Sequence, residues 1–161
     1  MTTAEYNKTV DLFADHVYRF ILKNLKDQDK AKDVVQDSYE KMWVNAPNVS
    51  FEKAKSYLFT TAYHTMIDLL RKEKRNADFE QVKQTEMQYN HEYSDLKEIL
   101  NQGLKNLPEI QRSVILLRDY EGYSYEEIGE ITGLNESQVK VYIYRARMYL
   151  KNFIGSMETV I

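Results

Sequence analysis

The chain has 161 residues, enough for one ordinary domain or two very small ones, and 43% of them are hydrophobic, which is sufficient for folded cores. The 22 basic and 25 acidic side chains give a net charge of −3, whereas a nucleic-acid-binding protein usually has a basic balance. The absence of cysteine excludes a disulfide framework and a thiolate zinc site. No aliphatic run approaches the roughly 20 residues of a membrane span, and the amino terminus lacks the apolar stretch of a signal peptide. We therefore expect a soluble, cytoplasmic protein.

The first half of the chain has helical periodicity. Apolar residues recur at helical spacing over 10–21 and again over 31–43. Pro47 and its asparagine neighbours break this pattern, and a third helix is expected from Phe51 to Arg75. Residues 1–75 are thus predicted to form one small helical domain.

A polar segment follows, over residues 76–93. The slightly longer stretch 76–98 contains six acidic and two basic side chains and few aliphatic ones, which predicts a flexible acidic linker that acts as a solvated spacer. Further helices are expected over 96–104 and 108–120, the second with proline in its first turn. Since no alternating strand pattern occurs, the sequence predicts an all-α fold, with two small helical domains at 1–75 and 94–161 joined by the linker.

Residues 124–147 are typical of a helix-turn-helix, the arrangement that presents one helix to the major groove of DNA. Ser124 and Glu127 have the spacing of a capping box, which begins the first helix. Gly129 lies where the two helices must approach closely, and Gly133 lies just past the first helix, where a left-handed conformation can close the turn. The alternative is a helical hairpin whose glycines only permit close packing.

The second helix of this motif carries positive charge. Asn135 can cap it with Gln138 at the third position, while Val139 and Ile143 point into the core. Its later turns hold basic residues, Lys140, Arg145, Arg147 and Lys151. A second basic patch lies over 53–75, and both patches could neutralise phosphates, although most charge runs are solvated helix faces.

Three segments in order carry a family resemblance: KAKDVVQDSYEKMW at 30–43, AKSYLFTTAYHTMIDLLRKEKR at 54–75, and LPEIQRSVILLR at 107–118, followed by the helix-turn-helix. Together they resemble an extracytoplasmic function sigma factor of the sigma-70 family. The resemblance implies an alternative sigma factor that binds bacterial RNA polymerase core and directs promoter-specific transcription initiation, without catalysis of its own. It assigns region 2 to residues 1–75 and region 4 to 94–161.

The resemblance also implies a polymerase-binding surface on the second helix. Asp33, Gln36, Asp37 and Glu40 recur at spacings of three and four, forming an acidic stripe suited to a basic partner helix. In the family this surface docks on the clamp helices of the largest polymerase subunit. The core-binding candidates are therefore Asp33, Val34, Gln36 and Asp37. The alternative is that the acidic stripe binds no partner and only keeps this helix face soluble.

Minus 10 recognition is expected around the non-helical break at residues 45–48 and along the third helix. Reading a single strand requires rings for stacking, amides for base edges and cations along the backbone. The candidates are Asn45, Asn48, Lys53, Lys55, Tyr57, Tyr63, His64, Arg71 and Arg75. Trp43 and Phe59 are expected to pack between helices instead. His64 stands where the family commonly has asparagine.

Minus 35 recognition is assigned to the helix-turn-helix. The first turns of its second helix should face base edges, and later basic groups should meet phosphates. The candidates are Ser137, Gln138, Lys140, Val141, Tyr144 and Arg145, with Arg112 and Arg147 as backbone contacts. Tyr142 and Gln138 depart from the family's usual residues, so promoter preference is expected to differ.

Catalysis and cofactors have little support in the sequence. The three histidines are scattered, and neither a glycine-rich phosphate loop nor a metal-ligand spacing is present, so no cofactor or metal is expected. The expected partners are polymerase core, promoter DNA and, by resemblance, an anti-sigma factor of a kind that is often membrane-bound. Two other functions stay open: a one-component regulator that binds duplex DNA without core, and a helical interaction protein.

Overall fold

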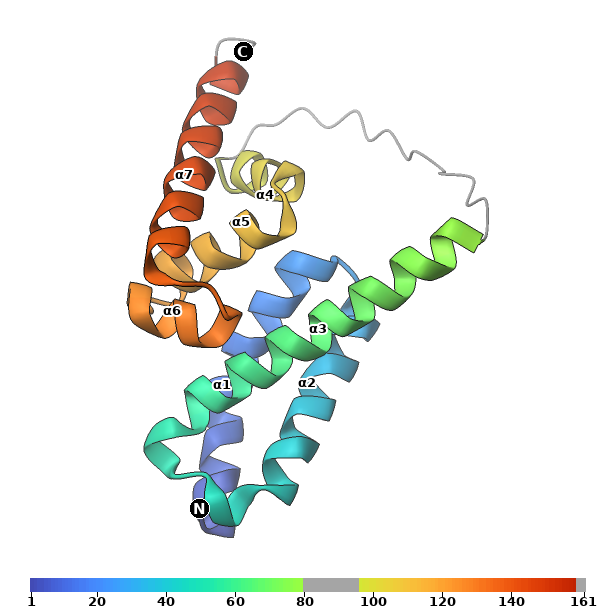
Figure 1. Cartoon of the computed structure of the whole chain (residues 1–161), viewed down its shortest axis with the longest axis vertical. Coiled ribbons are helices and arrows are strands. Elements are labelled where there is room, and N and C mark those ends of the chain that lie inside the picture. The colour runs from blue at the N-terminus through green and yellow to red at the C-terminus, as the bar shows by residue number, and fades with distance from the viewer. Residues whose placement is uncertain (80–95, 159–161) are drawn as a thin grey trace.

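A computed structural model describes residues 1–79 and 96–158, and every regular element in those ranges is helical, which confirms the all-α prediction (Figure 1). The first half contains α1 (Thr3–Leu25), α2 (Gln28–Val44), the short 3-10 turns η1 (Ala46–Asn48) and η2 (Phe51–Lys53), and α3 (Ala54–Phe79). The second half contains α4 (Leu96–Asn106), α5 (Glu109–Ile115), the π-helical turn η3 (Leu116–Tyr120), α6 (Tyr125–Thr132) and α7 (Glu136–Glu158). Within these described ranges, no helix has the length and apolar character needed to cross a membrane.

The ends of the first three helices follow local sequence signals. Thr2 forms a capping box with Glu5 at the start of α1, and Asp27 caps α2. Between them Lys26 adopts a left-handed φ of 57°, which lets α1 end and α2 begin within two residues. The third helix differs from prediction at both ends, since residues 51–53 form a 3-10 turn and α3 continues to Phe79. The rest of the predicted linker, 80–93, lies outside the described residues.

The core of the first half lies between α1, α2 and α3. The largest fully buried side chains there include Phe20, Met42, Phe59 and Met66, as expected for Phe59. Trp43 packs between helices as predicted, edge-on against Tyr6 of α1 at 5.0 Å between ring centroids, although the side chain is 50% exposed.

In the second half, α7 packs along α4 and α5, and α6 packs against α7. Ile128, Ile131, Val139 and Ile143 are buried between α6 and α7 and hold the helix-turn-helix together. Helix α7 continues for another three turns past residue 147, where the predicted helix-turn-helix motif ends. This extension contacts α4, where Leu150 and Phe153 lie over Gly103.

The two halves pack against each other in this structure. Helices α1 and α3 of the first half contact α4, α5 and α6 of the second (Figure 1). The buried apolar residues of both halves form one cluster. We call this boundary the seam, defined by Asn24, Lys55 and Phe59 on one side and Arg112 and Tyr123 on the other.

Candidate nucleic-acid interface

The helix-turn-helix has the geometry that its sequence predicts. The Ser124 hydroxyl accepts a hydrogen bond from the Glu127 amide at 3.1 Å, and the Glu127 carboxylate accepts one from the Ser124 amide at 3.0 Å. Gly133 has a φ of 81° and donates to the Gly129 carbonyl at 2.8 Å, closing the turn. A Cβ on Gly129 would lie 2.8 Å from the carbonyl oxygen of Leu134. Both glycines are therefore required by the backbone.

The second helix of the motif, α7, presents its polar face to solvent. Asn135 and Gln138 form a reciprocal cap at 2.8 and 3.0 Å, and burial of Val139 and Ile143 turns the opposite face outward. Tyr144 is 65% exposed on this helix, more than the other large apolar side chains exposed there. All the α7 candidates are exposed: Ser137, Gln138, Lys140, Val141, Tyr144, Arg145 and Arg147.

The cations on α7 are held by neighbours at the surface. Lys140 lies 3.4 Å from the Glu136 carboxylate. Arg147 makes a two-pronged contact with Asp119, at 2.6 and 3.2 Å, and the hydrogen bonds to this carboxylate raise the pKa of the guanidinium. Exposed pairs of this kind exchange readily for solvent or phosphate, since each is worth less than about 1 kcal/mol.

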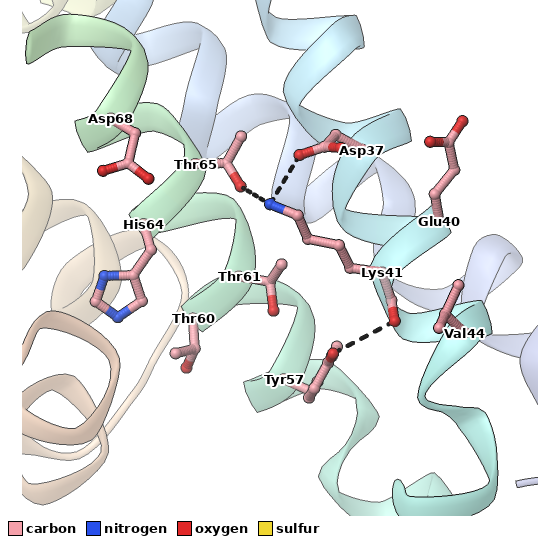
Figure 2. A pocket seen from close by; sticks show the side chains of 10 residues that line it. All are labelled: Asp37, Glu40, Lys41, Val44, Tyr57, Thr60, Thr61, His64, Thr65 and Asp68. Carbon is pink, nitrogen blue, oxygen red and sulfur yellow. Dashed lines mark hydrogen bonds and ion pairs between the residues drawn. The ribbon is translucent and has the colours of Figure 1, made fainter.

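A groove runs between α2 and α3 in the first half (Figure 2). Lys41 crosses it, with its ammonium 3.0 Å from Asp37 and 3.2 Å from the Thr65 hydroxyl. The predicted residues Tyr57 and His64 line the groove. Three further lining residues, Thr60, Thr61 and Thr65, were not predicted, because threonine carries no distinctive pattern in a helical sequence.

Five other minus 10 candidates, Asn45, Asn48, Lys53, Arg71 and Arg75, lie beyond the two ends of this groove. Between α2 and α3, the Asn48 side-chain amide donates to the Asn45 side-chain oxygen at 3.1 Å. Lys53, in the following 3-10 turn, is exposed. At the other end, four exposed cations surround a shallow hollow on the last described turns of α3: Arg71, Lys72, Lys74 and Arg75. The structure thus places amides, rings and cations along one half of the molecule.

The acidic stripe on α2 is partly as predicted. Asp33, Gln36 and Glu40 are exposed, and Asp37 is partly exposed. Val34 is not available to a partner, because its side chain is only 3% exposed and belongs to the core. Gln36 also borders a second groove, between α1 and α2, which the single-helix patterns did not reveal. Its apolar lining is Tyr6, Val10, Ala14, Tyr18, Val35 and Tyr39.

Three predicted DNA contacts face the seam instead of solvent. Tyr63 is 4% exposed, and burial together with the charge of Glu109 raises its pKa. Arg112 is 8% exposed. The Lys55 ammonium lies 5.0 Å from the centre of the Tyr123 ring. The surface assignments of Tyr63 and Arg112 are therefore wrong for this arrangement of the two halves, because sequence periodicity does not show which faces the halves bury against each other.

In the ranges that the structure describes, no cluster of three or more histidine, aspartate or glutamate side chains is placed to hold a metal ion. The fold and these surfaces define a two-part helical protein with one helix-turn-helix and a second polar groove.

Comparison with known proteins matches the two halves of the chain to two separate family models. Residues 9–76 match the family model for sigma-70 region 2, and residues 97–150 match that for sigma-70 region 4. The RNA polymerase sigma factor SigV of Bacillus subtilis is 36% identical over 143 residues, covering 85% of each chain. The extracytoplasmic function sigma factor SigM of the same organism is 27% identical, covering 87% of this chain and 89% of its own.

A solved structure shows the same fold. The sigma factor RpoE from Bartonella quintana, crystallised with the anti-sigma factor NepR, matches with a TM-score of 0.79 and 24% identity, over 93% of this chain and 96% of that one. The chain belongs to the sigma-70 family of RNA polymerase sigma factors, in the extracytoplasmic function group. It is an alternative sigma factor that directs promoter-specific transcription initiation.

Proposed function

We propose that the two halves of the chain divide promoter recognition between them. Residues 1–75 bind polymerase core and the minus 10 element, and residues 94–161 bind the minus 35 element. The observation that carries this proposal is that the region 2 and region 4 matches fall on separate halves, each of which has its own exposed polar surface.

On the minus 35 side, α7 lies in the major groove. Ser137, Gln138 and Val141 occupy its first turns and meet base edges, where amide, hydroxyl and apolar contacts distinguish base pairs. Tyr144 adds an exposed ring to the same face. The cations Lys140, Arg145 and Arg147 bind flanking phosphates, and Arg147 exchanges Asp119 for a phosphate oxygen.

On the minus 10 side, the separated strand follows α3. Tyr57 and His64 provide rings in the groove, and Asn45 and Asn48 provide amides at its end. Lys53, Arg71 and Arg75 neutralise the backbone.

Polymerase core binds the stripe of Asp33, Gln36 and Asp37 on α2. These side chains are on the surface, and the two aspartates carry negative charge, which attracts a basic partner helix and fixes its register. Because α2 contributes Asp37 both to this stripe and to the groove in Figure 2, core binding and strand reading are adjacent.

The chain acts as a non-catalytic subunit in the cytoplasm, where the polymerase works. We also propose that an anti-sigma factor, in some settings membrane-bound, restrains it. Support for this comes from two structural neighbours, RpoE with NepR and CnrH with the cytosolic domain of CnrY, the second with a TM-score of 0.67 and 19% identity.

Run-off transcription with purified core and a fragment library from the source genome tests the function. New start sites that require both core and this chain are expected. If the chain binds DNA fragments without core and yields no new start sites, it is a one-component regulator instead.

Two variants test the division of labour. Arg145→Ala should weaken minus 35 selection about tenfold while core binding is retained, since one charged contact is lost. Asp37→Arg should weaken core binding and leave fragment binding by α7 unchanged. Lys151→Ala and Asp11→Arg, which alter charge at other exposed positions, serve as matched controls. Equal loss of both activities in either folded variant would contradict the assignment.

A further inference from the structure

The aromatic ring of Tyr125 lies among cations that come from different elements of the second half. Tyr125 is the first residue of α6 and is partly buried. The Arg118 guanidinium, from η3, lies over this ring at 4.5 Å from its centre. The Lys140 ammonium, from α7, lies over it at 5.6 Å. One ring therefore joins a cation that precedes the helix-turn-helix to a cation on its second helix.

Arg118 anchors the ring to the backbone. Its side chain is partly buried, and its guanidinium donates to the Tyr123 carbonyl at 2.8 Å. A cation over an aromatic ring is attracted by the negative charge of the ring face. Because the guanidinium is itself held by a hydrogen bond, this attraction fixes where the Tyr125 ring lies.

The partner of Lys140 on its own helix does not fix its ammonium. The Lys140 side chain is 55% exposed, and its ammonium lies 3.4 Å from the carboxylate of Glu136, one turn earlier on α7. Exposed pairs of this kind contribute little, and the four-carbon stem of lysine leaves the ammonium many positions. Tyr125 supplies a second partner from another helix. The two partners together restrict where the ammonium lies.

The surroundings of Tyr125 are rich in positive charge. Tyr125 also lies close enough to Arg147 to contribute, after Asp119, to raising the pKa of that guanidinium. Three cations thus approach one ring, and cations brought together in this way repel one another. A ring attracts them without cancelling their charge, whereas a carboxylate in the same place would compete with phosphate.

We propose that Tyr125 is a positioning residue of the minus 35 surface, whose ring holds the Lys140 ammonium ready for a DNA phosphate. The proposal rests on the function assigned above, in which Lys140 binds a phosphate beside the minus 35 element. A lysine that is already held in place loses less side-chain freedom when the phosphate arrives, so its contact is stronger than that of a free lysine. Tyr125 acts through Lys140 and not through a contact of its own with DNA.

Tyr125→Leu is the direct test, because leucine keeps an apolar side chain at this partly buried position and removes the ring. Anisotropy of a mixed-sequence DNA duplex at low salt measures phosphate contacts whatever the promoter. Loss of one exposed attraction between a cation and a ring should weaken binding about two- to fivefold. Tyr125→Phe keeps the ring and should recover most of the lost affinity.

Tyr149→Leu is the matched control. It makes the same exchange on α7, at a ring that stacks on Phe153 with 6.0 Å between centroids. This variant should bind the duplex as tightly as the unaltered chain. Circular dichroism checks that each variant keeps its helices.

A double-mutant cycle separates positioning from a merely structural role. If the ring acts through the lysine, Tyr125→Leu should weaken binding no further once Lys140→Ala has removed the ammonium. In the background of Lys151→Ala, about three turns further along α7, it should weaken binding as much as in the unaltered chain. Equal loss of affinity in both backgrounds would overturn the proposal. Equal loss in Tyr125→Leu and Tyr125→Phe would also overturn it, because it would assign the effect to the hydroxyl.

The single variants distinguish failure of this proposal from failure of the proposed function. If Lys140→Ala weakens binding and Tyr125→Leu does not, the phosphate contact stands and the positioning role is refuted. If Lys140→Ala binds as tightly as the unaltered chain, the phosphate contact itself is wrong, and positioning for DNA fails with it.

Nuclear magnetic resonance measures the position of Lys140 without DNA. The ring should shift the signals of the Lys140 ε-methylene protons upfield in the unaltered chain and in Tyr125→Phe. The shift should vanish in Tyr125→Leu. Unshifted signals in the unaltered chain would overturn the positioning role whatever the duplex shows.

Discussion

Gly129→Ala should destabilise the second half, although alanine is normally the better helix residue. In a free helix the exchange gains about 1 kcal/mol. At this position the new Cβ would lie 2.8 Å from the Leu134 carbonyl oxygen, whereas ordinary contacts begin near 3.4 Å. Leu134 would have to move by about the difference between these two distances. It belongs to the turn that is closed by the 2.8 Å hydrogen bond from the Gly133 amide to the Gly129 carbonyl.

Because the obstructing atom is backbone, relief requires the turn itself to shift. Overpacking of this kind costs about 1–3 kcal/mol, which exceeds the gain in helix propensity. For a chain of this size, each kcal/mol lowers the Tm by about 2–4 °C. We expect the Tm of Gly129→Ala to fall accordingly, and α7 to bind the minus 35 element more weakly as its start is displaced.

Gly155→Ala is the matched control on the same half. It makes the identical substitution within a helix, but no atom lies within 4 Å of the added Cβ. This variant should gain a few tenths of a kcal/mol, up to about 1 kcal/mol, from helix propensity alone. Thermal unfolding followed by circular dichroism measures both. If Gly129→Ala is as stable as Gly155→Ala, the close approach does not constrain the turn and the reasoning is refuted.

Two other changes act on the helix ends. Asn135→Ala removes the cap of α7 and should cost about 1 kcal/mol, seen as a lower urea midpoint; an unchanged midpoint would show that the cap is not needed. Burial, with repulsion from Lys105 and Arg112, lowers the pKa of Lys26 to about 8. Since the unfolded lysine keeps its ordinary value near 10.4, the unfolded state binds more protons between these values, and stability should rise with pH in that window. Lys26→Gln should flatten this rise in pH-dependent unfolding, and an equally steep rise in the variant would assign it to other groups.

The sequence predicted those features that depend on local spacing. Both caps of the helix-turn-helix, its glycine turn and the inward positions of Val139 and Ile143 were confirmed, because each depends on residues within one or two turns. Helix limits were less accurate, since tertiary contacts carry α7 onto α4 well past the recognition turns.

Features set by distant contacts were missed. The family resemblance placed Val34, Tyr63 and Arg112 among the partner and DNA contacts, although the structure buries all three side chains. The groove between α1 and α2 requires two helices and has no signature in either one. The predicted packing of Trp43 between helices is present as its contact with Tyr6, but the pattern did not show that half of the side chain stays exposed.

The continuity of α7 has an evolutionary consequence. One helix carries both the outward residues that we propose as DNA contacts and the inward residues that fix its rotation, with Val139, Ala146 and Leu150 buried along its length. Substitution at Gln138, Val141 or Tyr144 can therefore change promoter preference while the position and rotation of the helix stay the same. An inserted or deleted residue would instead turn the reading face by about 100°. Promoter repertoires in such proteins should diverge by replacement at fixed length within this helix.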